Sequence, residues 1–574
     1  MKITGISGSR GVAVGTVYRY VQEEIVIPDY SVEADAVDAE VAKLEAGLEA
    51  TVDQLESIRQ KTLESMGEKE AAIFEAHKMI AQDPTLADGI KALVQTGVNV
   101  AAATQQVVDQ FAGIFLAMDD PYMRERGADI KDIGDRLLRN VLGMTPRGLA
   151  HLTGEVILVA QDLAPSDTAS LDTKVVKGIV TAAGGVTSHA AIMARTLEIP
   201  AVMGVGDISA FDEAERAIVL GTLGEVLVNP DDHTYDKHVE FARRYREQLA
   251  ALKDSAHLPA VTKCGQEVQL FGNIGKAIGA EKVRDMGGTG IGLFRTEFLY
   301  MENDELPSED DQFASYKEVA ETMGGQAVII RTMDIGGDKE LKCLDLPEEM
   351  NPFLGYRAIR ISLTRPDIFK VQLRALLRAS AFGDIHIMYP MITSVEEVKA
   401  ANAILEEAKN ELRAEGTAFN EHIKVGIMIE VPAAAIAAPI FAKYVDFFSI
   451  GTNDLCQYTL AVDRMNENIT HLYQPMHPSV LRLIKTVIDA SHAEGKFTGM
   501  CGEMAGDPLL TMILLGMGLD EFSMSAPSIP MVKHIVRSVT LDECKAIADH
   551  VMTLDTAEEI QAYAQRIMTE KGLN

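Results

Sequence analysis

Residues 260–574 alternate between short apolar runs and amphipathic helical patterns, and this alternation constrains the fold more than any other feature of the chain. Eight runs have the length and composition of buried strands: 268–272, 290–294, 327–332, 385–389, 424–429, 446–450, 497–500 and 521–524. Eight strand–helix units in a segment of this length predict a (β/α)8 TIM barrel, and a doubly wound open sheet is the alternative.

The first half of the chain has a different character. Residues 1–25 are typical of short strands, whereas residues 31–143 are helical in pattern. Apolar side chains recur there at spacings of three and four, as in an amphipathic helix: Val37, Val41, Leu44, Leu48, Val52, Leu55 and Ile58. Further helical patterns cover residues 69–82, 98–117 and 120–141. These patterns predict a small helical bundle.

Strand-like runs return after the helical segment. They cover residues 156–159, 175–181, 217–220 and 226–228, with a helical pattern at 188–197. The early strands would complete this α/β unit, which makes the bundle an insertion. A charged helical connector at 232–256 ends before Pro259. We therefore expect an α/β domain (1–25 and 144–230), a helical domain (26–143), a helical linker (231–259) and the barrel domain (260–574).

The chain is acidic, with 53 lysines and arginines, 85 aspartates and glutamates, and a formal charge of −32. This charge repels nucleic acid and anionic lipid, so we expect neither as a partner, whereas a basic protein would be attracted. The five cysteines are scattered without a CxxC pair, which argues against a disulfide framework or a zinc site. No apolar run has the length of a secretory leader or a bilayer span, so we expect a cytoplasmic protein without membrane insertion.

His189 lies where a strand-like run passes through a glycine pair into a helical pattern. Gly184 and Gly185 permit backbone angles that other residues resist, and Thr187 or Ser188 would cap the helix. The first turn of a helix offers free N–H groups that favour anions, and a neutral imidazole is a nucleophile. This context favours a phosphoryl group on His189, while a histidine that only caps or packs is the alternative.

The segment GGVTSHAAIMAR, residues 184–195, resembles the phosphohistidine motif of enzymes that use phosphoenolpyruvate. That group includes Enzyme I of the bacterial sugar phosphotransferase system, pyruvate phosphate dikinase and phosphoenolpyruvate synthase. The resemblance to Enzyme I extends over essentially the whole chain, including the stretch EKEAAIFEAHKMI. It implies a phosphohistidine α/β domain, a bundle that binds the phosphocarrier protein HPr, and a barrel that binds phosphoenolpyruvate and forms a homodimer. It also implies that His189 is phosphorylated on Nε2 and that Thr168 hydrogen-bonds the imidazole.

Polar side chains follow five of the predicted barrel strands, at the ends where barrel enzymes have their active sites. They are Arg295, Arg331, Glu430, Asn453, Asp454, Arg464 and Cys501. Phosphoenolpyruvate carries a phosphate and a carboxylate, and the planar guanidinium of arginine matches both groups. The carboxylates of Glu430 and Asp454 suit Mg²⁺, which would stabilise charge on the departing enolate.

The family resemblance assigns roles to the same positions. The residues that match phosphoenolpyruvate contacts in Enzyme I are Arg295, Arg331, Asn453, Asp454 and Arg464, with Lys339 and Arg357 as supporting contacts. Glu430 and Asp454 match the Mg²⁺ ligands, and Cys501 matches the acid that protonates carbon three of the enolate. A thiol with an unperturbed pKa of about 8.5 is mostly protonated at neutral pH and suits that role.

These residues predict a reaction in two steps. His189 takes the phosphoryl group while Cys501 converts the enolate to pyruvate, and a histidine of HPr then accepts the phosphoryl group, as in the first step of the sugar phosphotransferase system. The α/β unit must move relative to the barrel, with the connector at 232–256 as the hinge. The acids Glu68 and Glu75 are candidate contacts for a basic carrier.

Two positions depart from the family pattern. Cys456 lies two residues after Asp454, where relatives commonly have threonine, and we expect it to be a small packed residue. Val186 stands where relatives often have a basic residue, which would weaken phosphate contacts at the histidine.

Three other functions stay open from the sequence. A pyruvate phosphate dikinase or phosphoenolpyruvate synthase would need an ATP-grasp domain, and no ATP-binding glycine-rich loop precedes the histidine motif. A barrel lyase acting on pyruvate or its enolate leaves His189 unexplained. A non-catalytic regulatory partner predicts that site residues are lost, whereas they are present.

Overall fold

The structure of the chain, a computed structural model, describes all residues except 10, 22–24, 67, 117–120, 145–151, 169–170, 186–187, 198, 302–304, 338–343, 345, 347–348, 465, 467–468 and 574. The chain divides into two compact units, Met1–Glu247 and Gln248–Asn574. Among the helices of the described residues, none is long and apolar enough to cross a membrane.

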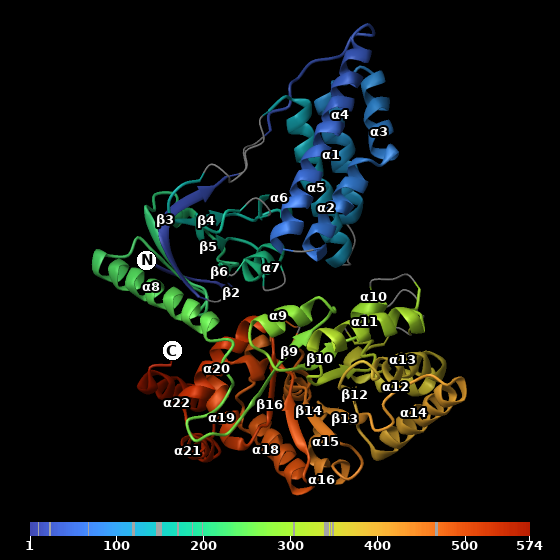
Figure 1. Cartoon of the computed structure of the whole chain (residues 1–574). Helices are drawn as coiled ribbons and strands as arrows, with labels where there is room; N and C mark the ends of the chain where they lie inside the picture. Colours follow the sequence, from blue (N-terminus) through green and yellow to red (C-terminus); the bar gives the residue numbers. More distant parts are fainter. Residues whose placement is uncertain are drawn as a thin grey trace. The chain divides into compact units, whose positions relative to one another are not determined.

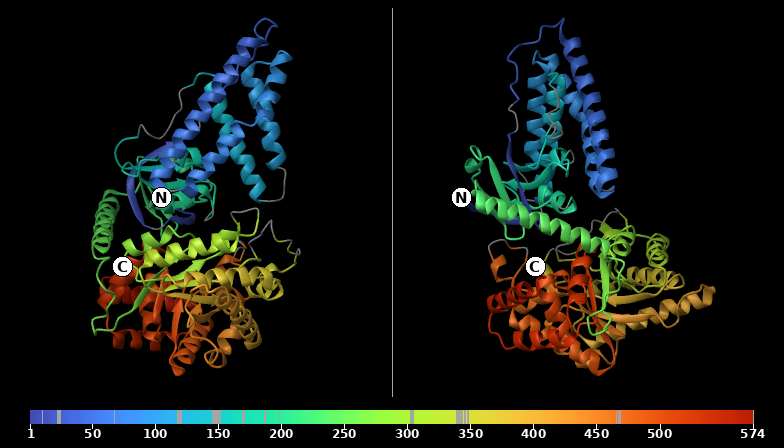
Figure 2. Two further views of the ribbon diagram at one scale, coloured as in Figure 1. Left: turned by 45° about the vertical axis from the view of Figure 1, so that its right-hand side comes forward. Right: turned by 60° about the vertical axis from the view of Figure 1, so that its left-hand side comes forward.

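The first unit contains a helical bundle (Figure 1). Its helices are α1 (Val37–Met66), α2 (Glu68–Ala81), α3 (Pro84–Gln95), α4 (Val100–Leu116) and α5 (Pro121–Val141). They lie side by side in both views of Figure 2 and bury a core that includes Leu44, Ile90 and Leu137. The sequence patterns overlook α3 as a separate helix. Asp83 marks its start, because its side chain accepts a hydrogen bond from the Thr85 N–H group at 2.8 Å.

The described part of the first unit also contains an eight-stranded sheet in the order β1-β8-β7-β3-β4-β5-β6-β2. The strands are β1 (Lys2–Thr4), β2 (Ile6–Ser9), β3 (Val12–Tyr20), β4 (Val156–Ala160), β5 (Val176–Thr181), β6 (Ala201–Met203), β7 (Arg216–Leu220) and β8 (Glu225–Val228). β3 and β4 are parallel neighbours although the whole bundle separates them in sequence. The bundle is therefore inserted between two adjacent strands. The sequence overlooks β6, because three residues are too short to show a strand period.

Two short helices follow strands of this sheet, and a long helix leaves it. α6 (Pro165–Thr168) comes after β4, and α7 (His189–Thr196) comes after β5. The long helix α8 (Asp232–Asp254) occupies the predicted connector, and the division between the two units falls within it.

The second unit is a closed barrel of parallel strands inside a layer of helices (Figure 1). The strands are β9 (Gln269–Ile274), β10 (Ile291–Arg295), β11 (Val328–Arg331), β12 (Ile385–Tyr389), β13 (Lys424–Ile429), β14 (Phe447–Ile450), β15 (Phe497–Met500) and β16 (Glu521–Met524). β16 pairs with β9 and closes the ring, so the barrel prediction is confirmed and the open sheet is excluded.

One predicted strand boundary is wrong. The first barrel strand was expected to end at Gly272, but β9 continues to Ile274. A Cβ atom at Gly272 would lie 2.1 Å from Val283 Cγ2, so this glycine permits close helix packing and does not end the strand.

The helices around the barrel are α9 (Gly279–Asp285), α10 (Glu297–Met301), α11 (Glu309–Met323), α12 (Ile359–Thr364), α13 (Pro366–Ala379), α14 (Val395–Glu415), α15 (Pro432–Ile436), α16 (Ala438–Phe441), α17 (Thr452–Leu460), α18 (Pro478–Ala493), α19 (Pro508–Met517), α20 (Ile529–Ser538), α21 (Leu541–Val551) and α22 (Ala557–Lys571). Several start at a serine or threonine in a capping box, as Ser394 does for α14.

Successive side chains of each barrel strand point to opposite faces, so they contribute to two separate cores. Outward residues such as Ile330 and Ile387 pack in the main core with the helices. A separate apolar cluster comprises Leu293, Ile329, Met388, Met428, Phe447 and Cys501. This cluster fills the interior of the barrel. Because side chains alternate along a strand, a residue two positions after a member of the cluster also points inward. Arg295, Arg331 and Glu430 follow Leu293, Ile329 and Met428 in this way, which places them at the C-terminal end of the barrel.

Candidate functional site

The C-terminal end of the barrel, which we call the barrel mouth, gathers charged side chains from several segments. Arg295 and Arg331 are the last residues of β10 and β11, and Glu430 directly follows β13. Asn453 and Asp454 lie in the first turn of α17, which follows β14. Cys501 directly follows β15.

Arg331 is buried between two carboxylates. Its Nη2 atom lies 2.6 Å from Glu297 Oε1, and its Nη1 atom lies 2.9 Å from Asp334 Oδ2. Burial alone would lower the pKa of Arg331, but Asp334 and Glu297 raise it, so the guanidinium stays charged. The cation is therefore held in a fixed orientation at the mouth.

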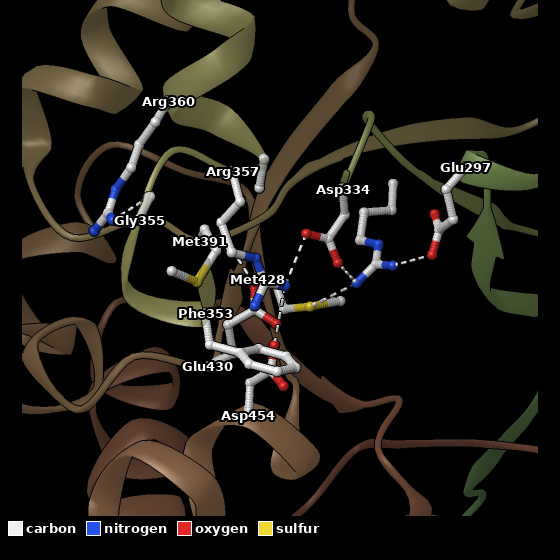
Figure 3. A network of polar contacts seen from close by, with 12 residues as sticks. Glu297, Asp334, Phe353, Gly355, Arg357, Arg360, Met391, Met428, Glu430 and Asp454 are labelled. Carbon is white, nitrogen blue, oxygen red and sulfur yellow. Dashed lines mark hydrogen bonds and ion pairs between the residues drawn. The ribbon is translucent and has the colours of Figure 1, made fainter. Parts of the chain in front are cut away.

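Arg357 extends this network, with Asp334 as the bridge (Figure 3). Its Nη2 atom lies 2.9 Å from Asp334 Oδ1 and 3.2 Å from Asp454 Oδ2. Its Nη1 atom donates to the Tyr458 hydroxyl at 3.2 Å, and that hydroxyl donates to the Phe353 carbonyl. Buried charges in such a chain fix one another, so a change in one moves its neighbours.

Glu430 is buried beside this network. Its Oε1 atom accepts a hydrogen bond from the Met391 N–H group at 2.6 Å. Met391 has a φ of 57°, a left-handed conformation that a non-glycine residue rarely adopts. Burial, together with the carboxylates of Asp454 and Asp334, raises the pKa of Glu430 to about 8. This carboxyl therefore gains from any cation that binds against it.

The remaining predicted contacts lie at the edge of the mouth. Arg464 is partly exposed, and its Nη1 atom lies 3.5 Å from Asp454 Oδ1. The Asn453 side-chain carbonyl accepts a hydrogen bond from the Glu503 N–H group at 3.2 Å. Arg295 is half-buried and makes no hydrogen bond or ion pair with another described residue. Its guanidinium is available to an anionic ligand.

Cys501 is buried at the top of the apolar interior cluster. Burial raises the pKa of its thiol to about 11. The thiol is therefore protonated over the whole neutral range, as a proton donor requires. Cys456 is also buried and free, and it packs in the main core as expected.

Glu430 and Asp454 fit a divalent cation by their donor atoms. Asp454 Oδ1 is buried and has no hydrogen-bond partner among the described residues, beyond the long ion-pair contact with Arg464. Within the same described residues, no three His, Cys, Asp or Glu side chains form a ready-made metal cluster. Mg²⁺ is commonly bound by one or two carboxylates, with substrate and water oxygens completing its coordination shell, and these two carboxylates match that pattern.

His189 begins helix α7 in the first unit. The side chain of Ser188 caps this helix by accepting a hydrogen bond from the Ala191 N–H group at 3.3 Å. Gly184 has a φ of 92°, and a Cβ atom there would lie 3.1 Å from Ser188 Oγ. Only glycine therefore permits this entry into the helix. Ala190 and Ala194 anchor α7 to the sheet.

Thr168 is the last residue of α6 and is fully buried. Its hydroxyl donates to the Pro165 carbonyl at 2.9 Å. A hydroxyl that donates in this way retains lone pairs that can accept a further hydrogen bond. Lys339, Val186 and Thr187 lie outside the described residues, as does the side chain of Glu68.

Comparisons with known proteins agree along the whole chain. Three family profiles match: PEP-utilising enzyme, N-terminal, at residues 4–126, its mobile domain at 152–224, and its PEP-binding domain at 249–541, where PEP is phosphoenolpyruvate. The chain is 49% identical over 574 residues to a phosphoenolpyruvate-protein phosphotransferase of Haemophilus influenzae, with 100% of both chains covered. The chain belongs to the phosphoenolpyruvate-protein phosphotransferase family.

A second full-length relative and a solved structure are also similar to the chain. A phosphoenolpyruvate-protein phosphotransferase of Enterococcus faecalis is 48% identical over 571 residues, covering 98% of this chain and 99% of the relative. A solution structure of Enzyme I is 38% identical and covers 42% of this chain and 99% of that chain, with a TM-score of 0.38. The chain is thus an enzyme of this family and carries out phosphotransfer from PEP.

Sequence reasoning missed several members of the barrel-mouth network. Asp334 bridges two arginines, Tyr458 supports Arg357, and the Met391 backbone supports Glu430. Asp334 has a sequence signal, because it lies three residues after Arg331 in the same strand-end segment. The Met391 contact has none, since a backbone N–H group carries no residue identity.

Proposed function

We propose that the chain transfers the phosphoryl group of PEP to its own His189, and then to a histidine of the carrier HPr, with release of pyruvate. This is the first step of the sugar phosphotransferase system. The observation that carries the proposal is the barrel mouth, where linked arginines and carboxylates lie near a buried, protonated thiol. An anionic substrate that becomes an enolate needs both features.

The arginines are suited to hold PEP. Arg295, Arg331 and Arg464, with Asn453 and Asp454, would contact its phosphate and carboxylate, and Arg357 and Lys339 would support them. Arg331 is already fixed by Glu297 and Asp334, so it loses little conformational freedom when an anion binds. Arg295 has no competing partner among the described residues.

Glu430 and Asp454 would hold Mg²⁺. When bound, the ion supplies positive charge that stabilises the phosphate and the developing enolate. Removal of divalent cations by a chelator should abolish pyruvate formation, and added Mg²⁺ should restore it. Pyruvate formation that is unchanged in the chelator would contradict this part of the proposal.

The chemistry at His189 and Cys501 balances without another reactant. An imidazole nitrogen of His189 forms a bond to phosphorus as the bond from phosphorus to the enol oxygen breaks. The thiol of Cys501 gives its proton to carbon three of the enolate and becomes a thiolate. Thr168 would orient the imidazole by accepting a hydrogen bond.

The second step needs a carrier and a movement. His189 must meet PEP first and HPr afterwards, and we propose that the units move about α8. The bundle would dock the carrier through acidic residues such as Glu68 and Glu75. Glu75 is half exposed and already lies 3.4 Å from Arg59 and Lys78, so a basic carrier would compete with those partners.

We also propose a cytoplasmic homodimer that forms through residues 260–574, as the family resemblance implies. Exposed apolar side chains on the barrel domain, including Ile436 and Ile440, support a protein contact there. Sedimentation of the full chain should give twice the monomer mass at micromolar concentration. A monomer at all concentrations would contradict the dimer.

Pyruvate formation with and without carrier tests the proposal. With PEP and Mg²⁺ alone, the chain should form about one pyruvate per His189 and then stop, because the histidine remains phosphorylated. Added HPr should make the reaction continuous. Continuous pyruvate formation with AMP and pyrophosphate, or with AMP and inorganic phosphate, in place of HPr would favour a dikinase or a synthase and contradict the carrier assignment.

A further inference from the structure

If Cys501 protonates the enolate, it must regain a proton before the next turnover. The thiol is 3% exposed and lies in the interior cluster with Phe447 and Met428, so water reaches it poorly. A buried thiolate is costly, since burial raises the pKa of this thiol to about 11. The interior of the barrel is therefore the place to look for a second proton donor.

Glu521 is a carboxyl group buried in that interior. It is 0% exposed on β16 and pairs with Gly499 of β15, two residues before Cys501 on the same strand face. Glycines make room for its side chain. A Cβ atom at Gly499 would lie 1.8 Å from Glu521 Oε2, and one at Gly292 would lie 2.4 Å from Oε1.

Neither carboxyl oxygen of Glu521 has a hydrogen-bond partner among the described residues. Burial raises the pKa of Glu521 well above its usual range, which favours the protonated, uncharged form of the carboxyl. The neighbouring Asp520 is different, because its carboxylate lies 2.8 Å from His492 Nε2 at a partly exposed position. Glu521 thus stores a proton without contributing an ion pair to the fold.

Hydrogen bonds link Ser523, a neighbour of Glu521 on β16, to the backbone of Cys501. Ser523 lies two residues after Glu521 on the same face of β16. A Cβ atom added at Gly292 would lie about equally close to the Ser523 hydroxyl and to Glu521 Oε1, so both side chains lie against this glycine. Ser523 Oγ donates to Asn273 Oδ1 at 2.6 Å, and Asn273 Nδ2 donates to the Cys501 carbonyl at 2.9 Å. The strand that carries the thiol is thereby fixed against the strand that carries the carboxyl.

We propose that Glu521 is the proton donor that restores the Cys501 thiol after each turnover. The inference rests on the proposed role of Cys501. In this step the O–H bond of Glu521 breaks, an S–H bond forms on the thiolate, and the electron pair stays on the carboxylate. Glu521 then regains a proton from solvent through the cavity that Asp520 and Gln269, the β9 partner of Glu521, help to line.

Rapid-quench measurement of pyruvate tests this in the full chain with PEP, Mg²⁺ and excess HPr. The first turnover of Glu521→Gln should stay within about twofold of the wild type, because Cys501 still starts protonated. Later turnovers should slow about 100-fold, the scale of a lost proton donor, which gives a burst of one pyruvate per chain. The control variant Thr498→Val removes a buried hydroxyl on β15 that has no proposed role, and it should leave the rates of the first and the later turnovers unchanged.

The pair Glu521→Asp and Glu521→Asn separates acidity from shape, because the two side chains differ little in size. The Asp variant should recover part of the later turnovers, and the Asn variant should not. Equal slowing of first and later turnovers, or equal rates for Asp and Asn, would overturn the inference. A wild-type chain that forms no pyruvate would instead overturn the proposed function, and this inference with it.

Discussion

The start of helix α7 and the barrel mouth are both suited to a phosphoryl group, but by different means. At α7 the means are local, since one glycine turn, the Ser188 cap and the first turn of the helix lie within a few residues. At the mouth, arginines and carboxylates come from segments far apart in the sequence, and Asp334 is shared between two arginines. A local site tolerates changes around it, whereas a shared network transmits them.

The largest expected effect comes from breaking the network. Arg331→Met removes a buried cation that lies between Glu297 and Asp334, and losing one partner of a buried pair costs about 3–5 kcal/mol. Loss of a positioned charge should also lower kcat/KM for PEP about 1,000-fold. Denaturant unfolding and pyruvate formation measure the two effects.

A matched arginine sharpens this result. Arg413→Met removes an exposed pair, with Arg413 Nη2 and Glu421 Oε2 at 2.6 Å, and should change little. If the two variants were equally stable and equally active, the barrel mouth would not depend on its shared charges.

The next effect concerns Cys501, the proposed proton donor. Cys501→Ser keeps the shape of the side chain but replaces the thiol with a much weaker acid, so pyruvate formation should fall about 100-fold. Cys456→Ser is the control, because Cys456 is buried in the main core and has no proposed role. A Cys456 variant that is as slow as the Cys501 variant would remove the special role of Cys501.

Thiol alkylation across pH tests the surroundings of Cys501. Only a thiolate reacts, and the thiolate appears as pH rises through the pKa. The hydrogen bond between Thr262 and Cys264 lowers the pKa of the exposed Cys264 thiol, whereas burial raises the pKa of Cys501 to about 11. Mass spectrometry of peptides should show Cys264 alkylated first and Cys501 intact up to pH 9. Equal reaction of the two below pH 9 would contradict the burial of Cys501.

The smallest expected effect concerns the local site. Ser188→Ala removes the α7 cap and should lower the stability of the first unit by about 1 kcal/mol. Asp83→Ala removes the cap of α3, which lies in the bundle. Only the Ser188 variant should slow phosphorylation of His189 in a time course with PEP. Similar slowing in both variants would show that general stability, and not the α7 start, controls the rate.

The sequence was most informative where structure follows local pattern. The barrel strands were predicted from apolar runs, and seven of them end within one residue of the prediction, such as β12 and β16. The α7 start was predicted from the glycine pair and Ser188. The short strand β6 was overlooked because three residues show no period, whereas helix α3 was overlooked although its buried residues Leu86, Ile90 and Val94 recur at spacings of four.

Tertiary relations of the site were beyond the sequence. The pattern predicted which strand ends carry arginines and carboxylates, but not that Asp334 joins Arg331 to Arg357. The sequence pattern also placed Glu521 in a strand and indicated nothing further about this residue. Whether a strand residue faces the interior depends on the barrel closing, and whether a carboxyl there has a partner depends on glycines in neighbouring strands.

Incubation with PEP labelled at phosphorus tests the central claim most directly. In the presence of Mg²⁺, the chain should acquire an acid-labile, base-stable label on the peptide that contains residues 184–195. His189→Ala should take up none, and His257→Ala, at an exposed histidine, should be labelled like the wild type. A labelled His189→Ala chain, or a label on any other peptide, would contradict the account.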